Sequence, residues 1–281
     1  MSEVFVRDES GLEGKINIFK KEGLNKIQVV SDFDRTLTQA FFKEKSVQTS
    51  YSLIREGNYL TKDYPKLAFA LFDKYHPYEI DESLSIAQKS KYMIKWWQEH
   101  LKVMIEQGMR KSVISDIVKK NKTVYRQGFF EFSKMLNDLE IPFLILSAGL
   151  GDIIQGSLEH NKSFYSNMKL IANFYDYNID GSIKGYLTTI IHPFNKNEAS
   201  IKSNDYFKKI MERSNIILLG DTLEDAEMIK GASCENLISI GFLNNSNSPK
   251  DLHEYSEKYD IIILNDSSMQ PALELIKRII K

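Results

Sequence analysis

Residues 29–38 read "VVSDFDRTLT", and this stretch decides the fold. Val29 and Val30 end an apolar run that is typical of a buried strand, and Asp32, Asp34 and Thr36 follow at alternate positions. Side chains two residues apart in an extended segment share one face, so two carboxylates and a hydroxyl would lie together at the strand end. Burying like charges is unfavourable unless something compensates them. The question is what this pair of acids binds.

The remaining chain alternates apolar runs with helical patterns. This alternation predicts an α/β fold with a Rossmann-like parallel sheet and right-handed crossovers. Such sheets bind ligands at the carboxyl ends of their strands, where Asp32, Ser147 and Asp221 would meet. The expected strands are 26–34, 141–149, 168–174, 214–222, 236–243 and 259–266, and the expected helices are 12–22, 129–139, 152–160, 198–213, 223–230 and 269–280.

Two insertions interrupt this alternation. Residues 46–125 are polar, aromatic and helical in pattern, clearest over 82–107, and they are too many for an ordinary crossover. We therefore predict a helical cap domain at 46–125 and a catalytic core at 1–45 and 126–281. A smaller insertion at about 173–194 contains Asp180-Gly181 between strand-like runs, which predicts a β-hairpin.

The composition excludes several classes of protein. The 281 residues are 42% hydrophobic, and 37 basic and 38 acidic residues give a net charge of -1. This balance does not favour a nucleic-acid polymer or an anionic membrane as partner. Cys234 is the single cysteine, and the N-terminal residues do not form the apolar segment of a signal peptide. We expect a soluble cytoplasmic monomer.

Each remaining candidate is ambiguous alone. Asp221 and Asp225 in "LLGDTLEDAEM" suit a metal site, but they equally suit capping of a helix. Ser147 in "LSAGLGD" is by itself a loop residue, and Lys196 in "HPFNKN" would ordinarily be solvated. Taken in order, two acids after the first strand, a serine, a lysine and a second acidic pair form the pattern of haloacid dehalogenase-type phosphohydrolases.

A closer resemblance extends from about residue 26 to the C-terminus. It is to the pyrimidine 5′-nucleotidase family of the cytosolic 5′-nucleotidase III type. The hairpin and "HPFNK" segments go beyond the general superfamily pattern. The segments that carry the resemblance are "SDFDRTLT", "QGFFEF", "FLILSAGLGDII", "NFYDYNIDGSIKGY", "IHPFNKN", "NIILLGDTLEDAEM" and "YDIIILND".

The resemblance implies a chemistry for the acids. Mg²⁺ would be held by the side chains of Asp32 and Asp221 and by the backbone carbonyl of Asp34, with Asp225 bound directly or through water. Asp32 would be the nucleophile that forms an aspartyl-phosphate. Asp34 would be the general acid and then the general base.

The phosphate group would be held by neighbouring residues. Ser147, the backbone N–H of Ala148 and Lys196 would bind its oxygens, and Thr36 would support the same loop through hydrogen bonds. The substrate that the resemblance implies is a nucleoside 5′-monophosphate: CMP, UMP or 7-methyl-GMP.

The cap would select the base. Glu79 matches the acidic position that faces the base in this family, although a solvated acid at a helix start is the alternative. Trp97 matches the stacking position and resembles the branch that accepts 7-methylguanosine monophosphate, since tryptophan gives the best cation–π face. For Trp96 we favour packing between cap and core.

Three positions depart from the family. His100 and Tyr51 stand where the pyrimidine branch has Ser and His, which bears on the contacts to base and ribose, whereas the catalytic residues are intact. His100 stays a candidate base-binding residue. Glu224 replaces a glycine beside the metal site, where it would either alter metal affinity or point outward.

Other activities remain alternatives at this point. A phosphatase for another small phosphomonoester, such as phosphoserine, would share the catalytic acids. A receiver domain that stores phosphate on an aspartate would lack turnover, and a catalytically silent binding protein is the third alternative.

Overall fold

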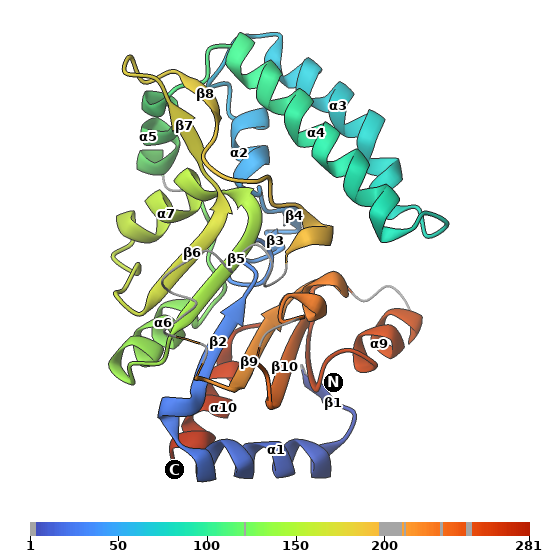
Figure 1. Cartoon of the computed structure of the whole chain (residues 1–281), viewed down its shortest axis with the longest axis vertical. Helices are drawn as coiled ribbons and strands as arrows, with labels where there is room; N and C mark the ends of the chain where they lie inside the picture. The colour runs from blue at the N-terminus through green and yellow to red at the C-terminus, as the bar shows by residue number, and fades with distance from the viewer. Residues whose placement is uncertain (1–3, 121, 197–209, 211, 231–232, 246–248) are drawn as a thin grey trace.

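The computed structural model describes residues 4–120, 122–196, 210, 212–230, 233–245 and 249–281. Within these residues the central sheet has seven strands, in the order β1-β11-β10-β9-β2-β5-β6 (Figure 1). The expectation of an α/β fold on a mostly parallel sheet is confirmed. The strands are β1 Val4–Val6, β2 Ile27–Ser31, β5 Phe143–Leu150, β6 Met168–Asn173, β9 Asn215–Gly220, β10 Asn236–Leu243 and β11 Ile261–Leu264.

The strand β2 lies inside the sheet, between β9 and β5. Val30 is paired in parallel with Leu144 of β5 on one side and with Leu218 of β9 on the other. Every residue of β2 is buried, as expected for a strand covered on both faces. The carboxyl ends of β2, β5 and β9 therefore meet at one edge of the sheet.

Two elements beside β11, at the outer side of the sheet, were not predicted from the sequence. The short strand β1 pairs antiparallel with β11, with Phe5 opposite Ile262. The helix α9 (Pro249–Ser256) lies near the same edge and has no fully buried residue. A three-residue strand and a weakly apolar helix both lack a clear hydrophobic period, which explains why neither was recognised.

Helices cover the sheet and hold it from outside. In α1, the Asp8 side chain accepts a hydrogen bond of 2.8 Å from the Gly11 N–H, and Leu12, Ile16 and Phe19 bury one face. These residues join side chains of α6 and α10 in the largest hydrophobic cluster. The covering helices are α1 Glu9–Glu22, α6 Phe129–Asp138, α7 Gly151–His160 and α10 Gln270–Ile280, with a short 3₁₀ helix at Leu24–Lys26.

Two of the expected helices need comment. The helix predicted at 223–230 is wrong in extent, because only a 3₁₀ helix at Glu224–Glu227 forms there. The tight turn lets the Asp225 side chain bond back to the N–H groups of the loop before it. The helix predicted at 198–213 lies outside the described residues, apart from 210, 212 and 213.

The chain between β2 and α6 supplies the helices that stand beyond the carboxyl edge of the sheet, toward which β2 points (Figure 1). Ile54, Met104 and Ile117 from these helices pack with Ile153 of α7 and Tyr175 of a β-hairpin in one hydrophobic cluster. The helices are thereby fixed to β5, α7 and the hairpin. They are α2 Ser50–Glu56, α3 Tyr64–Ile80, α4 Ile86–Glu106 and α5 Lys111–Lys120, and the hairpins are β7 Tyr175–Tyr177 with β8 Ile183–Tyr186 and β3 Phe41–Phe42 with β4 Lys45–Ser46.

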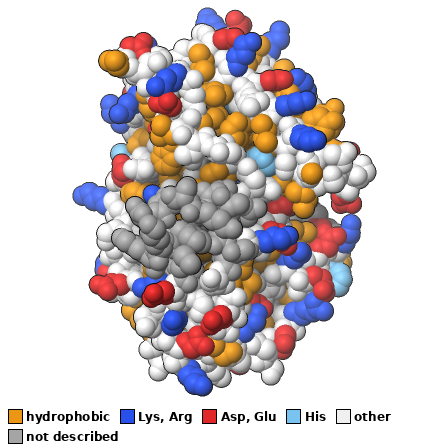
Figure 2. Space-filling model, in the orientation of Figure 1, with side chains coloured by type: hydrophobic (Ala, Val, Ile, Leu, Met, Phe, Trp, Pro, Cys, Tyr) orange, Lys and Arg blue, Asp and Glu red, His pale blue; other side chains and the backbone are white. Residues whose placement is uncertain are grey.

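The surface carries charges of both signs. Figure 2 shows acidic and basic side chains interspersed on the visible face, in agreement with the net charge of -1. Among the described residues there is no helix with the length and apolar character needed to cross a bilayer.

A buried arginine ties the segment after β2 to the rest of the core. Arg126 has no exposed side-chain surface; its Nε donates to the carbonyl oxygen of Thr36 at 2.8 Å, and its Nη1 donates to that of Ser267 at 2.6 Å. Its Nη2 donates to the carbonyl oxygen of Arg35, and the guanidinium pairs with Asp266 at 3.0 Å. The backbone that follows Asp32 is therefore held through its carbonyl groups.

We expect the substitution Arg126→Met to lower the free energy of unfolding by about 3–5 kcal/mol, because it leaves a buried carboxylate and several carbonyl groups without their partner. Urea unfolding followed by circular dichroism measures the change. The matched control is Arg278→Met, which removes an exposed pair with Glu13 and should cost at most about 1 kcal/mol. Equal effects of the two substitutions would contradict this role of Arg126.

Candidate active site

The carboxyl edge of the sheet gathers three acids and one lysine. Asp32 directly follows β2, Asp221 directly follows β9, and Asp225 lies in the 3₁₀ helix beyond. One carboxylate oxygen from each lies within 4.8 Å of the others. The Lys196 ammonium contacts Asp32 Oδ1 and lies 2.9 Å from Asp225 Oδ1. Two of these carboxylates thus contact one buried cation, and the third lies beside them.

Asp225 has both of its oxygens engaged. Oδ1 accepts from Lys196, and Oδ2 accepts from the Asp221 N–H at 3.2 Å, the Thr222 N–H at 3.1 Å and the Thr222 hydroxyl at 2.9 Å. Gly220 makes this approach possible, since a Cβ there would lie 2.4 Å from the Asp225 Cβ. Asp225 therefore holds the loop that carries Asp221, while the 3₁₀ helix itself has Leu223 at its N-cap and no side-chain cap hydrogen bond.

Burial and repulsion shift the pKa values of these groups. Desolvation raises the pKa of Asp32 to about 6, against the opposing effect of Lys196 and with a contribution from Asp225. Desolvation, Asp225 and Asp32 raise the pKa of Asp221 well above its usual range. Burial disfavours the charge of Lys196, but Asp225 and Asp32 outweigh it and raise the pKa of the ammonium. The cluster has an excess of negative charge.

This cluster fits a divalent cation. Its ligands are all carboxylate oxygens, the donor set that hard cations such as Mg²⁺ and Ca²⁺ take. Desolvation and the charges of Asp225 and Asp32 raise the pKa of Asp221, and a bound cation would oppose this shift. Both oxygens of Asp225 are engaged, by Lys196 and by the loop, whereas Lys196 contacts one oxygen of Asp32, so Asp32 and Asp221 are the side chains better placed to bind the ion.

Asp34 lies in a different environment from Asp32. It is not one of the three clustered acids, and its Oδ2 lies 3.1 Å from the position that a Cβ on Gly149 would occupy. Desolvation, followed by the charge of Asp32, raises the pKa of Asp34 to about 7, while a backbone hydrogen bond from Ser50 at the start of α2 lowers it. A carboxyl in this range holds and releases a proton near neutral pH.

Ser147 lies within β5 rather than in the loop that we expected after it. The register of β5 against β6 shifts between Leu146 and Leu150, and the Gly149 N–H donates to Ser147 Oγ at 3.0 Å. The bulge turns Ser147 and Ala148 toward the acids, where both line a cavity.

The phosphate-binding candidates are tied together by a residue that the sequence analysis missed. Asn173 Nδ2 donates to the carbonyl oxygens of Ala148 and Ile191, each at 2.8 Å, which links β5 to the segment that leads to Lys196. The signal available in the sequence was an asparagine near the end of the apolar run 168–174, and the structure buries this side chain. Thr36 is fully buried, does not line the cavity, and lies 3.3 Å from Asp221 Oδ1 through its hydroxyl.

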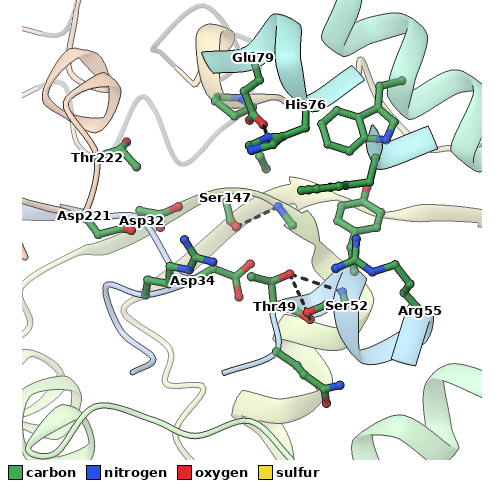
Figure 3. A pocket seen from close by; sticks show the side chains of 18 of the residues that line it. Asp32, Asp34, Thr49, Ser52, Arg55, His76, Glu79, Ser147, Asp221 and Thr222 are labelled. Atoms are coloured by element: carbon green, nitrogen blue, oxygen red, sulfur yellow. Dashed lines mark hydrogen bonds and ion pairs between the residues drawn. The ribbon is translucent and has the colours of Figure 1, made fainter. Parts of the chain in front are cut away.

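A cavity of about 590 Å³ runs from the acids to the helices α2, α3 and α4. Figure 3 shows Asp32 and Asp221 at one side and Arg55 at the other, with His76 and Glu79 together on a third wall. All the sequence-derived site residues except Thr36 line it. The catalytic-side lining includes Asp32, Asp34, Ser147, Ala148, Lys196, Asp221 and Asp225, and the helical side includes Tyr51, Arg55, Phe72, His76, Glu79, Trp96, Trp97 and His100.

Glu79 is not a helix-start acid, so that alternative is wrong. It lies in the last turn of α3, and its Oε2 is 2.9 Å from His76 Nδ1. Trp96 packs against Phe72 and Tyr75 of α3, within the predicted cap rather than between cap and core, and it lines the cavity. The sequence analysis missed His76, although its spacing of three residues from Glu79 in a helical segment was an available signal.

His100 is held as a neutral ring. Its Nε2 lies 2.9 Å from the Tyr64 hydroxyl, and the two rings stack at 6.0 Å. Burial, followed by the charge of Arg55, lowers the pKa of His100 to about 4. Tyr51 lies between His100 and Trp97, at centroid distances of 5.5 Å and 5.8 Å. Glu224 is exposed, so of its two alternatives the outward one applies.

The fold is similar to that of haloacid dehalogenase-type phosphohydrolases. A phosphoserine phosphohydrolase-like protein from Francisella tularensis shares the fold at 18% identity and a TM-score of 0.54, over 90% of this chain and 99% of that one. At this identity the likeness concerns the fold alone.

Further comparisons identify the family. Residues 35–280 match the pyrimidine 5′-nucleotidase (UMPH-1) family, and the chain belongs to that family of hydrolases. A "7-methylguanosine phosphate-specific 5′-nucleotidase A" of Xenopus laevis is 37% identical over 95% of this chain and 92% of that protein. The crystal structure of cytosolic 5′-nucleotidase IIIB bound to cytidine has a TM-score of 0.88 and 29% identity, over 99% of this chain and 94% of that one.

We expect Mg²⁺ to raise the Tm, and to raise it more at pH 8 than at pH 5. In the metal-free protein, Asp32 has a pKa of about 6, above the ordinary 3.8, so its contribution to stability is present at low pH and is lost as pH rises through 6. A cation binds the ionised carboxylate and offsets that loss, whereas below pH 6 it competes with the proton.

Thermal unfolding in chelator and in Mg²⁺ across this pH range measures the effect. The control is Asp221→Asn, which removes one carboxylate from the cluster and should greatly reduce the shift. A shift of equal size at pH 5 and pH 8, or an undiminished shift in the variant, would count against a metal site here.

Proposed function

We propose that this chain hydrolyses nucleoside 5′-monophosphates to nucleoside and phosphate, with Mg²⁺ bound at Asp32 and Asp221. The supporting observation is one continuous cavity that joins the acid and lysine cluster to an aromatic wall. The candidate substrates are CMP, UMP and 7-methyl-GMP. Family membership favours this activity over the phosphoserine phosphatase and receiver alternatives.

Asp32 is the proposed nucleophile. Its carboxylate oxygen would bond to phosphorus as the bond from phosphorus to the ribose 5′-oxygen breaks, giving an aspartyl-phosphate. The contact with Lys196 supports the ionised form of Asp32 before attack. Bound Mg²⁺ would neutralise charge on the carboxylates and the phosphate oxygens.

Asp34 is the proposed proton donor. With a pKa of about 7 it is partly protonated at neutral pH, so it can give its proton to the leaving 5′-oxygen. The resulting carboxylate then takes a proton from the water that attacks phosphorus and releases phosphate from Asp32. Proton donation and proton removal both require a side chain that lies beside the nucleophile but outside the acid cluster. Asp34 meets this requirement because it lies two residues after Asp32.

The transferring phosphoryl group needs donors. We propose that Lys196, the Ser147 hydroxyl and the Ala148 N–H bind its oxygens, with Thr36 holding Asp221 from below. Lys196 can serve both the acids and the phosphate because it carries three N–H donors.

We propose that residues 46–125 act as the cap that selects the base, over a core at 1–45 and 126–281 with the hairpin at about 173–194. Trp97 would stack on the base, Glu79 would accept its N–H groups, and His100 would contact the base or ribose. We also propose that the chain acts as a cytoplasmic monomer without a nucleic-acid or membrane partner.

The first test is steady-state phosphate release from CMP, UMP, AMP, GMP, 7-methyl-GMP and phosphoserine with Mg²⁺. We expect multiple turnover on CMP, UMP or 7-methyl-GMP. Asp32→Asn should reduce kcat by at least about 10⁴-fold, because an amide is not a nucleophile for phosphorus. Turnover on phosphoserine alone would refute the nucleotidase assignment.

A second test addresses the proton donor. We expect Asp34→Asn to lower kcat for CMP by about 10²–10⁴-fold. With p-nitrophenyl phosphate, whose leaving group needs no proton, the loss in the first chemical step should be far smaller. A pre-steady-state burst of nitrophenol separates that step from hydrolysis of the intermediate. Equal losses of the burst rate for both substrates would argue against Asp34 as general acid.

A further inference from the structure

Arg55 of α2 lies on the helical side of the cavity, in a position that the catalytic scheme does not use. Its side chain is 21% exposed and lines the cavity (Figure 3). The guanidinium carbon lies 4.7 Å from the ring centroid of Phe69 and 5.4 Å from that of Phe72. Its Nε is buried and has no hydrogen-bond partner within the described residues.

The charge of Arg55 is poorly neutralised by the protein. The carboxylate in contact with it is Glu56, whose Oε1 lies 3.5 Å from Nη2. Glu56 is 41% exposed and already accepts from Gln48 Nε2 at 2.7 Å, so solvent screens it. Glu79, the acid farther along the cavity, is engaged by His76. A positive charge that no buried carboxylate of the described residues neutralises therefore lines the cavity.

Arg55 belongs to the same wall as the residues proposed to bind the base. Phe72 stacks on His76 at 4.6 Å, and His76 in turn contacts Glu79. Phe72 also packs edge-on against Trp96, which contacts Trp97. The helical side of the cavity thus offers a donor fork at Arg55 and an acceptor at Glu79.

This wall suits some bases and opposes others. Uracil, cytosine and guanine carry carbonyl oxygens that a guanidinium fork can donate to. A 7-methylguanine ring is cationic, so the ring gains from a tryptophan face but is repelled by a nearby cation in a site of low dielectric constant. The charge of Arg55 therefore favours binding of neutral bases with carbonyl oxygens and opposes binding of a cationic base.

We propose that Arg55 is a specificity-determining residue that favours uncharged bases with carbonyl acceptors and disfavours a cationic base such as 7-methylguanine. The proposal rests on the proposed function for the identity of the ligand as a nucleotide. The preference for one base over another would then depend on Arg55 of α2 as well as on Trp97.

Phosphate release from CMP, UMP and 7-methyl-GMP tests this in mildly acidic buffer, in which the methylated ring is cationic. We expect Arg55→Met to raise the ratio of kcat/KM for 7-methyl-GMP over CMP by about tenfold or more. Arg55→Lys, which keeps the charge, should keep most of the discrimination, and Arg55→Gln replaces the methionine variant if that one does not fold. The control is Lys74→Met, which removes a cap charge outside the cavity.

Binding provides a second readout that needs no catalysis. The two tryptophans of the chain both line the cavity, so quenching of their fluorescence reports the binding of cytidine, uridine and 7-methylguanosine. The affinity ratio should shift in the same direction as the kinetic ratio. If no nucleotide is turned over but the affinities shift, the proposed function fails and the role of Arg55 stands.

Two results would overturn the proposal. An unchanged ratio in Arg55→Met or Arg55→Gln, in both readouts, would remove any role of the charge in base selection. An equal loss for all three nucleotides would mean that Arg55 contacts the ribose or phosphate that they share.

Discussion

The contact of the buried Lys196 ammonium with Asp32 and Asp225 is the interaction on which the rest of the site depends. Each charge would be strongly destabilising alone at this depth, so each stays buried only because the others are present. The three residues come from distant parts of the chain: the end of β2, the segment after β8 and the turn after β9. The pairing therefore fixes both the site and the way these segments converge.

Asp225 extends this constraint to the backbone. Asp225 accepts from Lys196 on one side and from the Asp221 and Thr222 N–H groups on the other. The position of Asp221 therefore depends on the position of Lys196. The absence of a side chain at Gly220 is what allows the turn to close this tightly. Capping and a site role were alternatives for this pair in the sequence; the 3₁₀ helix has no side-chain cap, and both acids lie beside Asp32.

The sequence predicted those features that depend on local pattern. Apolar runs located the strands β2, β5, β6, β9, β10 and β11, and the topology of parallel sheets then brought Asp32 and Asp221 to one edge. It did not predict β1 or the helix α9, which are short and depend on a partner strand or a sheet edge. Arg126 and Asn173 were missed for a related reason: their hydrogen bonds reach residues that only the folded chain brings near.

Arg55 and His76 were missed as cavity residues for a similar reason. The sequence of a helical segment does not indicate which of its faces will line a cavity. Asp32 and Asp34 illustrate the opposite case, because the sequence shows the pair but not how the two environments differ. Asp32 is buried and Asp34, two residues on, is half-buried, and of these two carboxylates it is that of Asp32 that contacts Lys196. Their pKa values, about 6 and about 7, follow this difference. A cation bound to the three clustered acids would lower the pKa of Asp32 further, while Asp34, outside that cluster, would be affected less. In the proposed mechanism, Asp32 would thereby stay ionised for attack on phosphorus while Asp34 would keep a proton for the leaving group, and this separation would arise from what each side chain contacts rather than from the motif itself.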